Sequence, residues 1–153
     1  MAQVSDDILE LQRLAFRYFL DYTNSNNGLV ADNTREDSPC SITATGLGLS
    51  CYPIAVANGW LDRADAAERV LTALRFFEHG PQGPEPDVTG YKGFYYHFLE
   101  MKDGRRAGMC ELSTVDTAFL LAGMLVASAF FDADTPAERE IRETADALFR
   151  RAQ

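Results

Sequence analysis

The chain has 153 residues, of which 46% are hydrophobic and 24% charged, and its formal net charge is −9. This length and composition predict one globular domain over residues 1–153 and exclude a disordered chain. The acidic balance, with no cluster of Lys and Arg, disfavours nucleic acid as a partner. No run is apolar and long enough for a membrane span, so we expect no membrane partner.

The start of the chain, MAQVSDDILELQ, has no basic segment followed by an apolar one. We therefore expect no secretory signal in this chain and a cytoplasmic location for the chain as written. Three cysteines, Cys40, Cys51 and Cys110, have no CxxC spacing. An odd number without that spacing predicts reduced thiols, with neither a disulfide framework nor a zinc site.

Five helices are predicted, over about residues 7–22, 42–58, 63–79, 114–131 and from 136 onward. The first has an apolar face that includes Ile8, Leu11 and Phe19, opposite a charged face. It ends in the polar turn TNSNNG. The second follows a Ser41 cap and contains no charged residue.

The third helix follows an Asp62 cap and carries one apolar stripe. The fourth begins after Ser113 and contains a single charged residue, Asp116. The fifth begins with a Thr135 cap and a proline at its first position, and Glu138 predicts a capping box there.

The helices alternate in character along the chain. The first, third and fifth are amphipathic, so one face of each meets water, whereas the second and fourth should be buried on most sides. This alternation predicts an all-α fold in which consecutive αα-hairpins form an outer and an inner layer of a toroid. The two long connections, 23–41 and 80–111, both lead into inner helices, and long structured connections are often functional.

The second long connection contains a predicted β-hairpin between the third and fourth helices. Its strands are FYYHFLEM and RAGMCEL, and it turns at Asp103-Gly104. Alternate residues of a strand point to opposite faces. We expect the face with Phe94, Tyr96 and Phe98 to pack on the helices and the other face to look into the mouth of the toroid.

Three segments and the start of the fifth helix resemble the glucoamylase-like domain family, which includes bacterial endo-β-1,2-glucanases and the hydrolase-like region of cyclic β-glucan synthases. The segments are GLVADN, SITATGLGLSCYPIAVANGWLDRADAAERVLTALRFF and GFYYHFLEMKDGRRAGMCELSTVDTAFLLAG. The resemblance implies an (α/α)6 toroid of twelve helices, of which this chain supplies an incomplete, N-terminal portion of about five. It also implies a glycan substrate, no cofactor, further active-site acids in later helices, and a family that is often periplasmic or secreted.

Glu111 and Asp116 stand at the start of the fourth helix and are the predicted catalytic residues. Glycoside hydrolysis uses one protonated carboxyl group and one ionised carboxylate. The helix dipole favours an ionised Asp116, which suits a base, and desolvation under the hairpin would raise the pKa of Glu111, which suits an acid. The alternatives are a capping box between Ser113 and Asp116 and a solvated hairpin end for Glu111.

Five further residues are predicted to bind the substrate: Asp32, Tyr91, Tyr95, His97 and Ser113. Asp32 lies in GLVADN, where an exposed charged loop is the alternative. Aromatic side chains stack on sugar rings and His97 donates hydrogen bonds, but residues of a hairpin also pack on the helices beneath them. No metal ligand is predicted.

Three functions remain open. The leading hypothesis is a glycoside hydrolase-like domain that acts on a β-linked glucan or a related oligosaccharide or polysaccharide through carboxylates. The second is a carbohydrate-binding module without turnover. The third is a helical-repeat remnant that assembles, for example as a homodimer, through the apolar flanks of an open toroid.

Overall fold

The computed structural model describes residues 5–152, so the first four residues of the segment used to judge a secretory signal lie outside it. Its helices lie within about a residue of the predicted bounds. They are α1 (Asp6–Asp21), α2 (Ile42–Ala57), α3 (Arg63–His79), α4 (Thr114–Phe130) and α5 (Pro136–Arg151). Over this part of the chain, no helix combines the length and apolarity that a bilayer crossing needs. All three cysteines are free thiols, as predicted.

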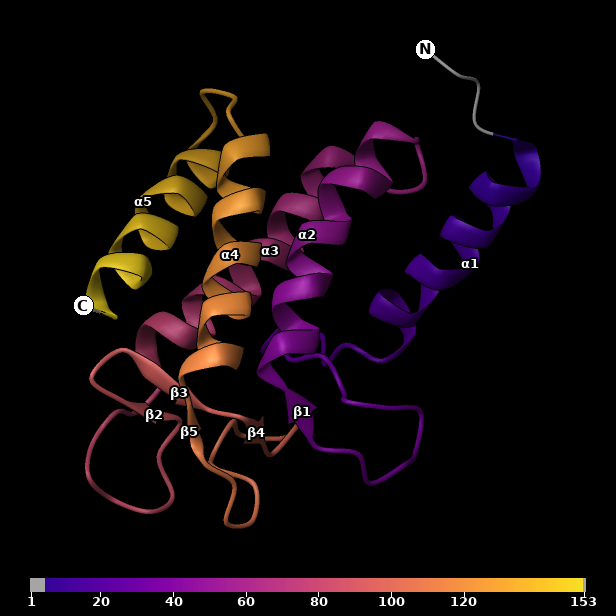
Figure 1. Ribbon diagram of the computed structural model, residues 1–153. Coiled ribbons are helices and arrows are strands. Elements are labelled where there is room, and N and C mark those ends of the chain that lie inside the picture. The colour runs from indigo at the N-terminus through magenta and orange to yellow at the C-terminus, as the bar shows by residue number, and fades with distance from the viewer. Residues whose placement is uncertain (1–4, 153) are drawn as a thin grey trace.

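The helices form the two layers that the alternation predicts. α2 and α4 run side by side at the centre, with α1 and α5 to either side and α3 behind (Figure 1). α2 packs mainly against α4, and α3 packs mainly against α5. The prediction of an all-α fold with an inner and an outer layer is therefore confirmed.

Two glycines bring the inner helices together. A Cβ atom added to Gly123 on α4 would lie 1.9 Å from the carbonyl oxygen of Gly46 on α2. A Cβ atom added to Gly46 would lie 2.5 Å from the carbonyl oxygen of Phe119. The two backbones are thus in direct contact, and no larger residue fits at either position.

Short strands gather at the end of the molecule where α2 and α4 begin (Figure 1). They are β1 (Cys40–Ser41), β2 (Gly90–Tyr91), β3 (Phe94–Tyr96), β4 (Phe98–Leu99) and β5 (Leu112–Ser113). β3 pairs with β2 and β5, whereas β4 pairs with β1. The predicted hairpin is therefore divided at His97 between two small sheets, although its turn lies near Gly104 as expected, with φ +71°.

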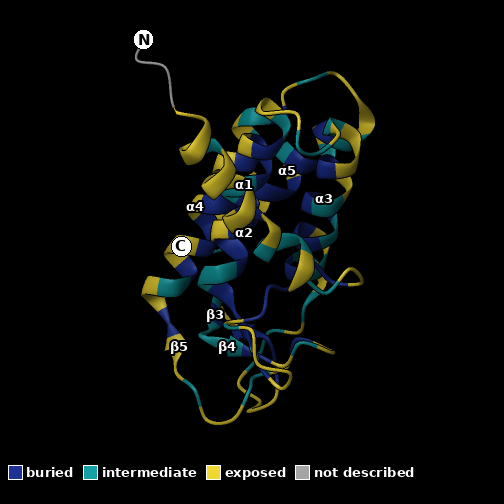
Figure 2. Ribbon diagram, turned by 90° about the vertical axis from the view of Figure 1, so that its right-hand side faces the viewer, coloured by how far each residue is buried: buried dark blue, intermediate teal, exposed yellow. Residues whose placement is uncertain are grey.

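The expectation that the inner helices are buried on most sides was wrong. Leu47 on α2 is 48% exposed, and Val115 and Phe119 on α4 are 63% and 52% exposed. The described helices form only part of a ring, so one apolar face of the inner pair has no neighbouring helix among residues 5–152. α1 also lies largely in solvent, and Phe16 is the residue it buries (Figure 2).

An ion pair joins the start of α3 to the start of α5. Arg63 donates from Nε and Nη2 to the two carboxylate oxygens of Glu138, at 2.8 and 2.7 Å. The Glu138 side chain is 6% exposed and also accepts from the Ala133 N–H. Thr135 caps α5 as predicted, but the Glu138 carboxylate bonds Arg63 and Ala133 instead of closing the predicted capping box.

Glu138→Gln should lower the free energy of unfolding by about 2 kcal/mol at neutral pH, because it removes charge-assisted hydrogen bonds from Arg63, which is 37% exposed and keeps Asp132 as a partner. The Arg63 hydrogen bonds outweigh burial and hold the pKa of Glu138 below its ordinary value. This stabilisation is therefore present above the ordinary pKa of glutamate and is lost as the pH falls through the lower folded value. Urea unfolding of the variant should show a smaller loss of stability on acidification.

The matched control is Glu140→Gln. Glu140 also pairs with an α3 arginine, Arg75, but the two side chains are 40% and 45% exposed. We expect this variant to lose less than about 1 kcal/mol. Equal losses in the two variants would contradict the role assigned to the buried pair.

Candidate functional site

Asp116 and its cap Ser113 lie at the start of α4, at the end of the molecule where both inner helices begin (Figure 1). We call this end the mouth. Ser113 is the N-cap of α4, and its hydroxyl accepts a hydrogen bond from the Asp116 N–H at 3.1 Å. The first half of the predicted capping box is therefore present. The same hydroxyl donates to Asp116 Oδ2, so Ser113, which is 7% exposed, is engaged with the carboxylate.

Asp116 is held from a second helix as well. Thr43, in the first turn of α2, donates from Oγ1 to Asp116 Oδ1 at 2.6 Å. The Asp116 side chain is 17% exposed. Burial acts to raise the pKa of Asp116, but the hydrogen bonds from Ser113 and Thr43, together with His97, outweigh it and lower the pKa. Asp116 is thus held as a carboxylate, as expected for a base or for an acceptor of sugar hydroxyls.

His97 lies between the two predicted catalytic acids. Its Nδ1 atom is 2.9 Å from Glu111 Oε1, and its Nε2 atom is 3.7 Å from Asp116 Oδ1. The backbone brings these residues together, since the His97 N–H donates to the Glu111 carbonyl at 3.0 Å. The imidazole stacks on Phe98, with ring centroids 3.9 Å apart. Sequence analysis assigned His97 to the sugar, whereas both of its ring nitrogens face carboxylates.

The expectation of a raised pKa at Glu111 was wrong. Its side chain is 65% exposed, so the predicted desolvation is absent. The backbone N–H of Glu111 itself and the hydrogen bond with His97 lower the pKa instead. The pKa shifts of both carboxyl groups thus favour the ionised form, and the assignment of Glu111 as the acid remains a prediction.

Glu111, His97 and Asp116 each present a polar atom within 4.8 Å of the others. Donor atoms this close could surround a metal ion. However, both Asp116 oxygens already accept hydrogen bonds from side chains. We therefore treat the three residues as a hydrogen-bonded cluster, and the expected absence of a metal remains a prediction.

The packing expected for the aromatic strand was wrong at Tyr95. This side chain is fully buried, and its hydroxyl donates to the Phe77 carbonyl at 3.2 Å. Arg151, at the end of α5, donates to the Tyr95 hydroxyl and to the same carbonyl. We predicted that this face of β3 looks into the mouth, but Tyr95 anchors the strand in the core. A buried tyrosine is stable there because its hydroxyl has hydrogen-bond partners. Tyr95 is therefore not available to stack on a sugar.

Asp32 and Tyr91 have other partners than the cluster residues. Asp32 is in the exposed loop before β1 and accepts a hydrogen bond from Asn33 at 3.1 Å. Tyr91 is 38% exposed at the end of β2, and the Lys92 ammonium lies 5.2 Å from the centre of its ring. In the described chain, no hydrogen bond or ion pair joins either residue to His97, Glu111 or Asp116. Their assignment to substrate binding remains a prediction.

Thr43 is the contributor that sequence analysis missed. It lies in the uncharged stretch SITATG, where a threonine gives no sign of chemistry. The available signal was its place in the first turn of an inner helix. If the two inner helices begin at the same level, their first turns face each other, and a hydroxyl there can reach Asp116.

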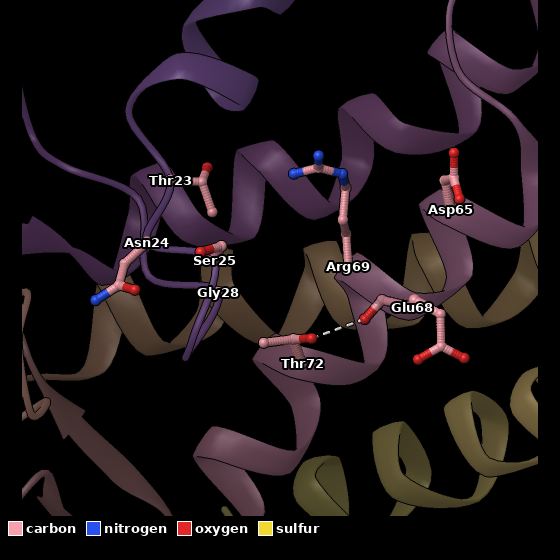
Figure 3. Close-up of a pocket in the computed structure, with 8 residues that line it drawn as sticks. All are labelled: Thr23, Asn24, Ser25, Gly28, Asp65, Glu68, Arg69 and Thr72. Atoms are coloured by element: carbon pink, nitrogen blue, oxygen red, sulfur yellow. Dashed lines mark hydrogen bonds between the residues drawn. The ribbon is translucent and has the colours of Figure 1, made fainter.

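A pocket outside the cluster lies beside the outer helix α3. It has a volume of about 390 Å³ and lies between the loop after α1 and α3 (Figure 3). Its lining residues are Thr23, Asn24, Ser25, Gly28, Asp65, Glu68, Arg69 and Thr72. The Thr72 hydroxyl donates to the Glu68 carbonyl of its own helix. None of these residues belongs to the cluster, and their mixed charges select no particular chemistry.

No family model matches the chain. A curated relative, the exo-β-1,2-glucooligosaccharide sophorohydrolase (non-reducing end) of Parabacteroides distasonis, is 24% identical over 149 residues. The match covers 94% of this chain and 20% of the relative. The chain therefore spans about a fifth of the length of the curated relative that it matches.

Solved structures match almost the whole chain. A protein provisionally named a glucoamylase, from Bacteroides uniformis, is 28% identical with a TM-score of 0.83, and the match covers 99% of this chain and 37% of that one. The β-1,2-glucanase of Parabacteroides distasonis is 23% identical with a TM-score of 0.82, over 99% and 22%. The endo-β-1,2-glucanase of Chitinophaga pinensis is 19% identical with a TM-score of 0.82, over 99% and 37%.

The chain has the fold of a part of these toroids, so the prediction of an incomplete α/α toroid is confirmed. The chain resembles the glucoamylase-like proteins, as its sequence motifs predict, over nearly its whole length and over a minor part of theirs.

Proposed function

We propose that this chain forms part of a glycoside hydrolase-like site for a β-linked glucan, in which Asp116 is the central carboxylate. The observation that carries this proposal is the anchoring of Asp116 by Ser113 and Thr43 at the open ends of α4 and α2. A carboxylate fixed in this way can accept hydrogen bonds from sugar hydroxyls or activate water. The names of the relatives, which are β-1,2-glucan hydrolases, support the same substrate class.

In this proposal the described residues supply a base but not a protonated acid, so they do not form a complete acid and base pair. Asp116 acts as base or hydroxyl acceptor, and His97 holds Glu111 beside it. The lowered pKa of Glu111 means that it needs a proton from elsewhere before it can act as an acid. A separate acid from outside residues 5–152 would complete hydrolysis, which is consistent with the short share of each relative that this chain matches. No cofactor is required for this chemistry.

Asp116→Asn should abolish the function of this site with little effect on folding, because the amide keeps the shape and loses the charge. Turnover of β-1,2-glucan oligosaccharides, where present, should fall by at least about a hundredfold. Saccharide affinity, measured by calorimetry, should also fall. Glu140→Gln, which neutralises a half-exposed carboxylate on α5 outside the cluster, is the control, and an equal loss in that variant would contradict the proposal.

The pH dependence of saccharide binding provides a second test. Because the donors around Asp116 lower its pKa below the ordinary value of 3.8, the carboxylate is charged at neutral pH and loses its charge only as the pH falls through this lower value. The contribution of Asp116 to affinity should therefore be constant from neutral pH down to the ordinary range of aspartate and weaken below it, and a His97→Gln variant removes the imidazole as a second titrating group. Weakening centred well above that range would assign the binding to another group.

The second candidate is carbohydrate binding without turnover. It is favoured by the lowered pKa of both carboxyl groups, because each shift disfavours the protonated form that an acid needs. This function predicts saccharide affinity with no products after long incubation. Products released by the isolated chain, and lost in Glu111→Gln, would decide for hydrolysis.

Assembly of two copies is a separate proposal, supported by the apolar face of the inner helices. Leu47, Val115 and Phe119 form an exposed, uncharged surface, so two copies would meet there without opposing like charges. Light scattering on a sizing column should give the mass of a dimer, and Phe119→Glu should give a monomer. Met109→Glu is the control, because Met109 is 85% exposed on a loop. A monomeric unmodified chain would contradict this proposal.

A further inference from the structure

We propose that Thr43 is a positioning residue, which fixes the carboxylate of Asp116 from the neighbouring inner helix and so determines how that carboxylate meets a saccharide. The inference rests on the proposed function only in assigning the saccharide to Asp116. The hold of Thr43 on Asp116 is a property of the two helices and can be tested without any ligand.

The geometry gives each oxygen of Asp116 its own donor. Thr43 Oγ1 donates to Oδ1 at 2.6 Å, and Ser113 Oγ donates to Oδ2. Ser113 lies next to α4 and moves with Asp116, whereas Thr43 belongs to α2. Only the Thr43 bond therefore fixes the carboxylate relative to the rest of the inner layer. Without it, the side chain retains one anchor and can rotate about its Cβ–Cγ bond.

The distance between Thr43 and Asp116 is set by the backbones. About one turn after Thr43 on α2 and two turns after Asp116 on α4, Gly46 and Gly123 hold the two helices in direct contact, with no side chain between them. Side chains can adjust by changing rotamer, but a backbone contact leaves little freedom. The first turns of the two helices are thus kept at a fixed separation that a threonine hydroxyl spans.

The charged and titratable groups that face Asp116 are His97 and Glu111. His97 Nε2 lies 3.7 Å from Oδ1, the oxygen that Thr43 also holds, and Glu111 lies at the other ring nitrogen. Thr43 therefore holds Oδ1 at a distance too long for a direct hydrogen bond to the imidazole. Loss of Thr43 leaves Oδ1 without a hydrogen-bonding side-chain donor, so the ionised form of Asp116 loses stabilisation and the carboxylate is free to turn.

The test compares Thr43→Val, which keeps the shape and removes the hydroxyl, with Thr43→Ser, which keeps the hydroxyl. The readout is the titration of the Asp116 side-chain carboxyl carbon, followed by NMR on the whole chain without ligand. We expect the pKa of Asp116 to rise in Thr43→Val and to return towards its original value in Thr43→Ser. An unchanged titration in Thr43→Val would overturn the inference.

The matched control is Thr72→Val, because the Thr72 hydroxyl bonds only a carbonyl of its own helix, at 2.9 Å. This variant should leave the Asp116 titration unchanged. If Thr43→Val lowers the melting temperature, the Thr43→Ser variant still decides, since recovery of the Asp116 titration requires the hydroxyl. Failure of the serine to restore the titration would also overturn the inference.

Saccharide binding separates this inference from the proposed function. Calorimetry with β-1,2-glucan oligosaccharides should show about tenfold weaker binding for Thr43→Val, and recovery for Thr43→Ser. If no saccharide binds the unmodified chain, the proposed function fails, while the ligand-free titration still decides whether Thr43 holds Asp116. If saccharide binding is unchanged although the Asp116 titration shifts, Thr43 does position the carboxylate. The inference that this positioning affects saccharide recognition is then overturned.

Discussion

The contact between the backbones of α2 and α4 is the constraint on which the site depends. Gly46 and Gly123 remove the side chains that would separate two inner helices. The helices begin at the same end of the molecule, so this contact also brings their first turns together (Figure 1). Thr43 and Asp116 can then share a hydrogen bond although they are far apart in sequence. A backbone contact one to two helical turns away thereby helps to set the geometry of the polar cluster.

The surroundings of the polar cluster favour ionised carboxylates over a carboxyl group that can donate a proton. Ser113 and Thr43 stabilise the ionised form of Asp116, and the Glu111 backbone N–H and His97 do the same for Glu111. A hydrolase that works through carboxyl groups needs two of them in different protonation states. In the described cluster the pKa shifts favour the ionised form of both carboxyl groups. Binding and turnover must therefore be tested separately in this chain.

Hydrophobic periodicity and helix caps predicted the fold well, because each is a local property of the sequence. The Ser41, Asp62, Ser113 and Thr135 caps all form, and the layers follow from which helices lack charge. The errors arose where the answer depended on distant residues. Tyr95 is buried because Arg151 and Phe77 meet its hydroxyl, and Glu111 is exposed because no element among residues 5–152 covers it. Thr43 gave no local signal, since its partner lies on another helix.

The burial of Tyr95 links the site to a distant helix end. Arg151 bonds the Tyr95 hydroxyl and two carbonyls at the end of α3, so the last turn of α5 ties down the strand that leads to His97. Local opening of that turn would release the strand and, with it, the imidazole between the two carboxylates. The amide protons of β3 and of the final turn of α5 should consequently exchange with solvent as one cooperative unit, even though they lie in different layers of the fold.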